Sequence, residues 1–203
     1  MPRPRRAPVL QAARAAIAAA AAVCALAPWR GASAEPVVYR LDPTHSFVHF
    51  ELDHFGASTT RGRFGPVTGE VTLDRAARRG RVQVRIPTAS VSLGFPAFDA
   101  RVRRADLLAV DEHPEAFFVA EQVLFDGDAV REVRGELTLR GTSRPLVLRA
   151  LRFRCYLNPL WRREVCGGDF EGEAVRSEFG MDFALPVVGD RVRLLIQVEA
   201  LRD

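Results

Sequence analysis

The sequence lacks several features on which common protein functions depend. Its alanine-rich apolar run, residues 15–27, is shorter than the roughly 20 residues that a membrane-spanning helix needs. The nucleophile motif G-x-S-x-G is absent, which argues against a hydrolase built around Ser46. The sequence also shows no domain linker, low-complexity tract or internal repeat. These absences favour one domain without a hydrolase site at Ser46.

The first 34 residues have the composition of a cleaved export signal. Four arginines precede the end of the apolar run, and Ala32-Ser33-Ala34 stands before Glu35, as at a signal-peptidase site. We therefore expect residues 1–34 to be removed and residues 35–203 to form the domain, which we expect in the periplasm. A retained membrane anchor is the alternative. Arg5-Arg6 leaves the general secretory and twin-arginine export routes both open.

The net charge depends on that cleavage. The whole chain carries +4, with 29 basic residues, all of them arginine, and 25 acidic residues. Five of the arginines and none of the acids lie in residues 1–34, so residues 35–203 hold 24 basic against 25 acidic residues. No basic surplus remains to neutralise phosphates, and nucleic acid is therefore not expected as a partner.

Cysteine is scarce, and its placement is informative. Cys24 leaves with the signal, and the remaining pair, Cys155 and Cys166, brackets a loop rich in turn residues. In an exported protein we expect this pair to form a disulfide that stabilises the fold by about 3 kcal/mol. A metal site is the alternative, but no histidine follows Cys155 and two thiolates leave zinc half-ligated. We therefore expect no metal.

Ten segments show the pattern of β-strands. In residues 47–54, Val48, Phe50 and Leu52 fall on one face at a period of two, and the last segment repeats that alternation. Glycine, Asp-Gly or proline separates most segments, which predicts an all-β domain, either a sandwich or a barrel. The segments are residues 38–41, 47–54, 58–64, 69–74, 81–86, 117–125, 133–140, 146–153, 170–175 and 192–201.

One segment departs from the period of two. Between residues 96 and 110, Phe98, Val102, Ala105 and Leu108 recur at a spacing of three to four, as on one stripe of a short helix. Pro114 would stop this helix. We expect it to form a lid over one end of the β-structure.

The inward rows of the predicted strands are almost purely aliphatic. Residues 82, 84 and 86 are valine, valine and isoleucine, and Leu194, Ile196 and Val198 continue the same character in the last strand. Such rows usually form an ordinary packed core. The pattern by itself favours that outcome over a hollow interior.

Four stretches, in order, resemble the YceI-like family of small polyisoprenoid-binding proteins. They are LDPTHSFVHFELDHFGASTTRGRF (residues 41–64), ADLLAVDEHPEAFF (105–118), GELTLRGTSRPLVL (135–148) and RSEFG (176–180) with GDRVRL (189–194). The resemblance covers nearly the whole chain after residue 37. It implies an extended, lipocalin-like, eight-stranded antiparallel barrel with the helix as its lid. Its apolar cavity would hold a polyisoprenoid lipid, such as an isoprenoid quinone, without catalysis or a covalent cofactor.

The resemblance turns the inward rows into candidate ligand contacts. Burying hydrocarbon is favourable by about 0.8 kcal/mol per CH₂, so a few prenyl units could offset the roughly 4–15 kcal/mol cost of association. The expected cavity-lining residues are Val48, Phe50, Leu52, His54, Val84, Ile86, Leu107, Leu108, Phe118, Leu137, Leu139, Leu146, Leu148, Phe179, Leu194 and Ile196.

The pattern favours structural roles for the histidines of residues 45–54. His54 continues the row of Val48, Phe50 and Leu52, and a histidine there is usually a hydrogen-bonded core residue. The functional alternative is a polar contact to a lipid head group. His45 and His49 share a strand face that excludes His54, so the three should not converge on a metal. We expect His45 to hold the start of its strand.

Two functions from different classes follow. The preferred one is a periplasmic carrier of a polyisoprenoid lipid. The alternative is a partner module that docks on a membrane respiratory complex or an envelope enzyme. The protein could also contact a membrane transiently or form a homodimer.

Overall fold

The computed structural model describes residues 35–203, and the expected signal segment lies outside the described residues. Within residues 35–203, no helix is long and apolar enough to cross a membrane. The elements are β1 (Val37–Leu41), β2 (Phe47–His54), β3 (Ser58–Phe64), β4 (Thr68–Asp74), β5 (Arg79–Pro87), the 3₁₀-helix η1 (Thr88–Ser90), α1 (Pro96–Val102), β6 (Glu115–Asp126), β7 (Ala129–Leu139), β8 (Thr142–Asn158), β9 (Arg163–Val175), η2 (Arg176–Phe179) and β10 (Arg191–Arg202).

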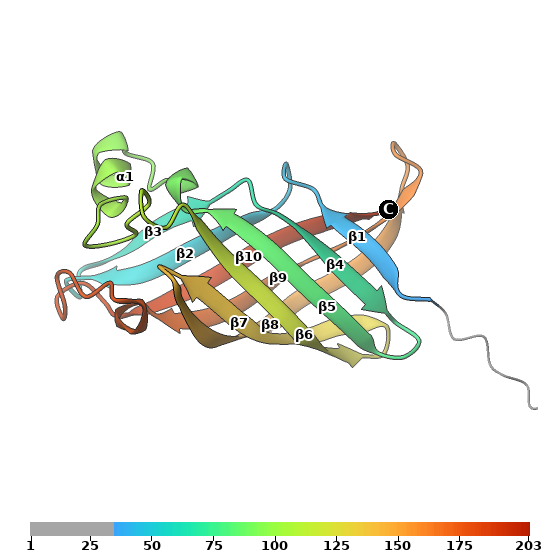
Figure 1. Ribbon diagram of the computed structural model, residues 1–203. Coiled ribbons are helices and arrows are strands. Elements are labelled where there is room, and N and C mark those ends of the chain that lie inside the picture. Colours follow the sequence, from blue (N-terminus) through green and yellow to red (C-terminus); the bar gives the residue numbers. More distant parts are fainter. Residues whose placement is uncertain (1–34) are drawn as a thin grey trace, which may run out of the picture. The chain divides into compact units, whose positions relative to one another are not determined.

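The strands form one antiparallel sheet that closes on itself (Figure 1). Its order is β1-β4-β5-β6-β7-β8-β9-β10-β2-β3, and an additional pairing of β1 with β10 closes the barrel. One edge of β10 pairs first with β2, through residues 193–197, and then with β1, through residues 200–202. The segments β1 and β2 therefore act as one interrupted wall strand. The segments β3 and β4 do the same, so ten strands build an eight-stranded barrel, as predicted.

Hydrogen bonds hold the interruption between β1 and β2 in place. Asp42 N–H donates to the Glu199 carbonyl at 2.8 Å, and the buried Ser46 hydroxyl donates to the same carbonyl at 3.1 Å. Within the turn, Asp42 accepts hydrogen bonds from the N–H of Thr44 (2.8 Å) and from Nδ1 of His45 (2.7 Å). The expectation that His45 holds the start of its strand is confirmed.

All ten predicted segments are strands, but β8 and β9 extend well beyond their predicted ends. Together they form a long hairpin whose tip, residues 157–162, projects past the end of the barrel where the C-terminus lies (Figure 1). Cys155 and Cys166 face each other directly across the β8–β9 ladder and are joined by the predicted disulfide. The bridge therefore braces the neck of a hairpin rather than a loose loop.

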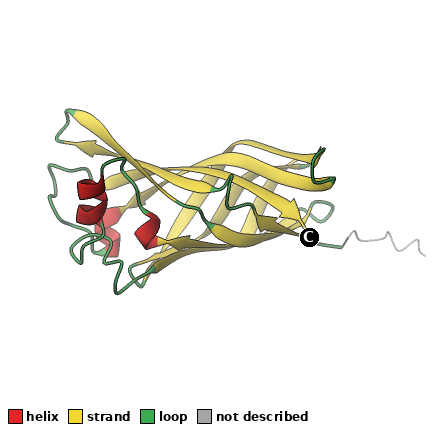
Figure 2. Ribbon diagram, turned by 90° about the horizontal axis from the view of Figure 1, so that it is seen from above, coloured by secondary structure: helices red, strands yellow, loops and turns green. Residues whose placement is uncertain are grey.

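The lid is shorter in its helical part than predicted. Helix α1 ends at Val102, so the predicted helix through Val110 is wrong in its second half. Beyond the helix, Leu108 N–H turns back to the Val102 carbonyl (3.0 Å) and Ala109 adopts a φ of +48°. Leu108 and Ala109 are buried by these turns, whereas Phe98 on the helix is exposed. Figure 2 shows the helical elements gathered at one end of the barrel.

Candidate functional site

The interior of the barrel is hollow. It contains an inner cavity of about 180 Å³ and, towards the lid, an outer cavity of about 330 Å³. The two adjoin, because Phe64, Leu137, Leu139 and Leu194 line both. The inward rows therefore pack against one another but also enclose two cavities, so the solid core that the sequence pattern by itself favours is not what they form.

The inner cavity has an almost wholly hydrocarbon wall. All eight wall strands contribute to it, because each presents alternate side chains to the interior. Thr88 is one of its few polar side chains, and it donates its hydroxyl proton to the His113 carbonyl at 2.7 Å. Tyr39 is another, and it is fully buried. A ligand in this cavity would meet hydrocarbon on almost every side.

A polar cluster closes the far end of the inner cavity. The Tyr39 hydroxyl donates to Glu164 at 3.0 Å, and Glu164 also accepts from Arg75 at 2.7 Å and lies 3.7 Å from Arg202. Burial, then the hydrogen bond to Glu164, raises the pKa of Tyr39. Glu164 is therefore paired within the cluster, and the barrel has a hydrogen-bonded floor at this end.

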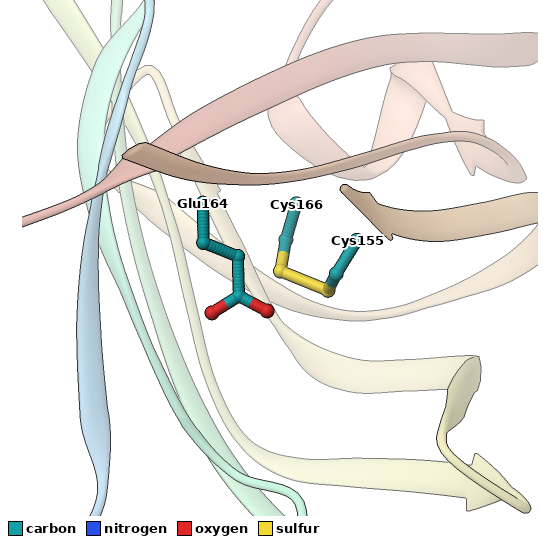
Figure 3. Close-up of side chains that lie close together, drawn as sticks. All are labelled: Cys155, Glu164 and Cys166. Atoms are coloured by element: carbon teal, nitrogen blue, oxygen red, sulfur yellow. A yellow bond between two sulfur atoms is a disulfide. The ribbon is translucent and has the colours of Figure 1, made fainter. Parts of the chain in front are cut away.

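Glu164 also lies beside the disulfide (Figure 3). Cys155, Glu164 and Cys166 are the one group of potential metal ligands within residues 35–203 whose donor atoms all fall within 4.8 Å of one another. Zinc is bound by thiolates, however, and both sulfurs here are joined to each other. With Glu164 already bound by Tyr39 and Arg75, the group is a structural brace.

The outer cavity lies between the barrel and the lid. Strands β2 and β3 form one wall, the segment from Val91 to Leu108 forms the lid side, and residues 176–188 complete the mouth. Phe179 and Leu108 are buried in a small core of their own beneath the lid. The polar side chains in this lining are His54, Thr60, Arg101 and Arg176.

Arg176 lines the outer cavity, but the sequence analysis did not name it as a candidate. Its side chain is buried, and Nε, Nη1 and Nη2 donate to the carbonyls of Gly189 (2.8 Å), Met181 (2.5 Å) and Val188 (2.9 Å). Burial lowers the pKa of Arg176, and nearby Asp190 and Asp182 oppose that shift. The guanidinium holds the loop of residues 181–189 against the barrel. The RSEFG motif contained this arginine, but nothing in the pattern showed that its side chain turns inward.

All sixteen predicted cavity residues line the two cavities. Their contact with a ligand stays a prediction. The inner cavity is lined by Val48, Val84, Ile86, Phe118, Leu146, Leu148 and Ile196. The outer cavity is lined by Phe50, Leu52, His54, Leu107, Leu108 and Phe179. Both cavities are lined by Leu137, Leu139 and Leu194.

His54 differs from its structural interpretation. Its side chain is exposed at the mouth of the outer cavity and packs against Phe55, with 4.8 Å between ring centroids. The interpretation as a buried core histidine is wrong, because β2 ends at His54 and the barrel wall no longer covers it.

Comparisons with known proteins agree with this architecture. The YceI-like domain family matches residues 39–200. Protein YceI of Shigella flexneri is 31% identical over 174 residues, which cover 84% of this chain and 90% of the relative. The UPF0312 protein PSPA7_0523 of Pseudomonas paraeruginosa is 32% identical over 170 residues, covering 81% and 87%.

Two solved structures show the same fold. Burkholderia cenocepacia BcnA superposes with a TM-score of 0.65 at 22% identity, covering 78% of this chain and 98% of that protein. A polyisoprenoid-binding domain from Saccharophagus degradans, implicated in plant cell wall breakdown, gives a TM-score of 0.55 at 17% identity, covering 82% and 99%.

Proposed function

The chain belongs to the YceI-like family, and from this premise we propose that it is a carrier that binds a polyisoprenoid lipid without chemistry. The observation that carries the proposal is the hollow interior with its hydrocarbon wall. The solved relative from Saccharophagus degradans, which is described as polyisoprenoid-binding, supports the same ligand class.

The shape and chemistry of the site suit a long apolar chain. The inner and outer cavities adjoin end to end through Phe64, Leu137, Leu139 and Leu194, so one flexible chain could extend through both. Each buried CH₂ contributes about 0.8 kcal/mol. An isoprenoid quinone would place its polar ring at the mouth, where His54 and Arg101 stand. We propose a periplasmic location, which the composition of residues 1–34 and the disulfide support.

Organic extraction tests the carrier function directly. The purified, folded protein is extracted with organic solvent, and the extract is analysed by mass spectrometry. We expect a polyprenyl lipid in near-stoichiometric amount. An empty extract, together with no uptake of an added isoprenoid quinone from detergent, would reject the carrier function.

A second candidate function rests on the tip of the β8–β9 hairpin. Leu157, Leu160 and Trp161 are exposed there by 71%, 86% and 45%, at the end of the barrel away from the lid. Asn158 Oδ1 accepts hydrogen bonds from the N–H groups of Leu160 (2.9 Å) and Trp161 (3.2 Å) and so orders the tip. A rigid tip that combines apolar side chains with the indole N–H of Trp161 suits a partner module that docks on an envelope protein. Loss of that complex on substituting the tip, with lipid content unchanged, would identify it.

A further inference from the structure

A set of exposed apolar side chains lies at the mouth of the outer cavity. We call it the mouth rim, and it consists of Phe55, Phe95, Phe98, Phe183 and Val187, which are exposed by 60%, 55%, 58%, 50% and 46%. They come from the β2–β3 turn, the segment that leads into α1, α1 itself and the loop that follows η2. Monomeric proteins rarely expose so many large apolar groups together without a binding role.

Contacts join the members of the mouth rim. Phe55 N–H donates to the Val187 carbonyl at 2.7 Å, which ties the β2–β3 turn to the loop after η2. Phe95 and Phe98 meet edge to face, with 5.3 Å between centroids. Arg101 of α1 lies over Phe183 at 4.1 Å, which connects the lid to the same loop. The rim is therefore a connected surface rather than scattered side chains.

The mouth rim continues the wall of the cavity. Phe98 and Phe183 line the outer cavity and are also half exposed. A lipid chain leaving the barrel would pass beside these two rings. In water the exposed chain would lose about 0.8 kcal/mol per CH₂. An apolar phase placed against the rim would remove that cost, because the chain would move from one hydrocarbon environment directly into another.

We infer that the mouth rim docks on a lipid bilayer and inserts its side chains among the acyl chains. The inference rests on the proposed carrier function, because the bilayer is where a polyisoprenoid lipid resides. It deepens that function by naming the partner from which the lipid is taken.

The chemistry of the rim favours a bilayer over a protein partner. Its five side chains carry no polar atom, so they offer no hydrogen bond by which a protein surface could be selected. Arg101, the cation that lies over Phe183, is already held by Asp106 through two hydrogen bonds of 2.8 and 2.6 Å. Docking should therefore depend on apolar insertion and only weakly on anionic lipid or on salt.

The chain offers a matched control at its other end. The hairpin tip exposes Leu157, Leu160 and Trp161 to at least a similar extent. The rim variant combines F55N, F95S and V187S, three positions outside the lining of either cavity. The tip variant combines L157S, L160S and W161S. Both variants remove three exposed apolar side chains.

The experiment measures flotation of the purified protein with phosphatidylcholine vesicles, with and without phosphatidylglycerol, and uptake of ubiquinone from those vesicles. We expect the wild-type protein to float with both compositions. The partition coefficient of the rim variant onto vesicles should fall at least about tenfold, which corresponds to about 1.4 kcal/mol. The tip variant should float as the wild-type protein does. Uptake of ubiquinone from detergent micelles should be unchanged in both, which shows that the barrel is intact.

Each other outcome rejects the docking inference. Absence of wild-type flotation, an unaffected rim variant, or a loss confined to the tip variant would each overturn it. Light scattering without vesicles tests a second copy of the chain as the occupant, and a dimer that dissociates in the rim variant and does not float would assign the rim to that dimer instead. If neither the wild-type protein nor the variants take up ubiquinone from micelles, the carrier function is rejected. The flotation result then still shows whether the mouth rim binds the bilayer.

Discussion

The guanidinium of Arg101 lies over the ring of Phe183, with 4.1 Å between its central carbon and the ring centroid. Arg101 belongs to α1 and Phe183 to the loop after η2, and both line the outer cavity. The contact therefore links the lid to the opposite side of the mouth. A cation–π contact of this kind contributes roughly 0.5–2 kcal/mol.

Breaking that contact should loosen the mouth. We expect R101Q to release bound ubiquinone a few-fold faster, by stopped-flow transfer to acceptor micelles, because a contribution of about 1 kcal/mol corresponds to a factor of five in rate. R81Q on the outer face of β5 is the control. Equal release rates in R101Q and wild type would show that the contact does not gate the cavity.

Filling the interior should expel the ligand. Leu137 lines both cavities, so L137W places an indole where they adjoin. We expect lipid content to fall to a small fraction of wild type by organic extraction, with the free energy of unfolding changed by about 1–3 kcal/mol. V119W, on the exposed side of β6, should keep its lipid. Full lipid content in L137W would contradict the assignment of the cavity.

The disulfide should be complete and stabilising. Thiol titration of the unreduced, unfolded protein, processed to residues 35–203, should find no free thiol, because Cys155 and Cys166 are bonded. The free energy of unfolding of the C155S/C166S double variant, measured in urea, should fall by about 3 kcal/mol. Without the disulfide the unfolded chain gains conformational entropy, which favours unfolding. Two reactive thiols in this titration would exclude the bridge.

Stability should depend on pH through His45 and Asp42. The hydrogen bond to Asp42 raises the pKa of His45 above its usual 6.5. The contribution of His45 is thus present below pH 6.5 and is lost as the pH rises through its folded-state pKa. We expect the free energy of unfolding to decline on this account above pH 6.5, and H45Q to remove that decline. An identical pH profile in H45Q would exclude His45 as the source.

The same pair acts in the opposite direction in acid. Burial tends to raise the pKa of Asp42, but the hydrogen bonds from Thr44 and His45 outweigh burial and lower it below 3.8. Its stabilising contribution is therefore present above pH 3.8 and is lost as the pH falls through the lowered pKa. Urea unfolding between pH 3 and 5 should show D42N with a flatter profile than wild type.

Most strand positions were predictable, and the exceptions have physical causes. Alternation located β2 and β3 to the residue. The helix was overpredicted because Leu108 and Ala109 have helical spacing but reach the interior through turns, including a residue at positive φ. His54 was misplaced because alternation indicates a direction and not whether a neighbouring strand covers it. Arg176 was missed because its acceptors are backbone carbonyls, which no sequence pattern displays.

The sequence by itself determined which side chains face inward, because a strand alternates its faces whatever its neighbours are. It also indicated that the two cysteines pair, although only the structure showed that they face each other across a hairpin. Only the tertiary structure decided that ten segments make eight walls, since β1 and β2 share one edge of β10. Only the closed sheet decided that the inward rows enclose a cavity, because the width of a barrel follows from strand number and stagger. Strand number and stagger in turn depend on hydrogen bonds between segments far apart in the chain.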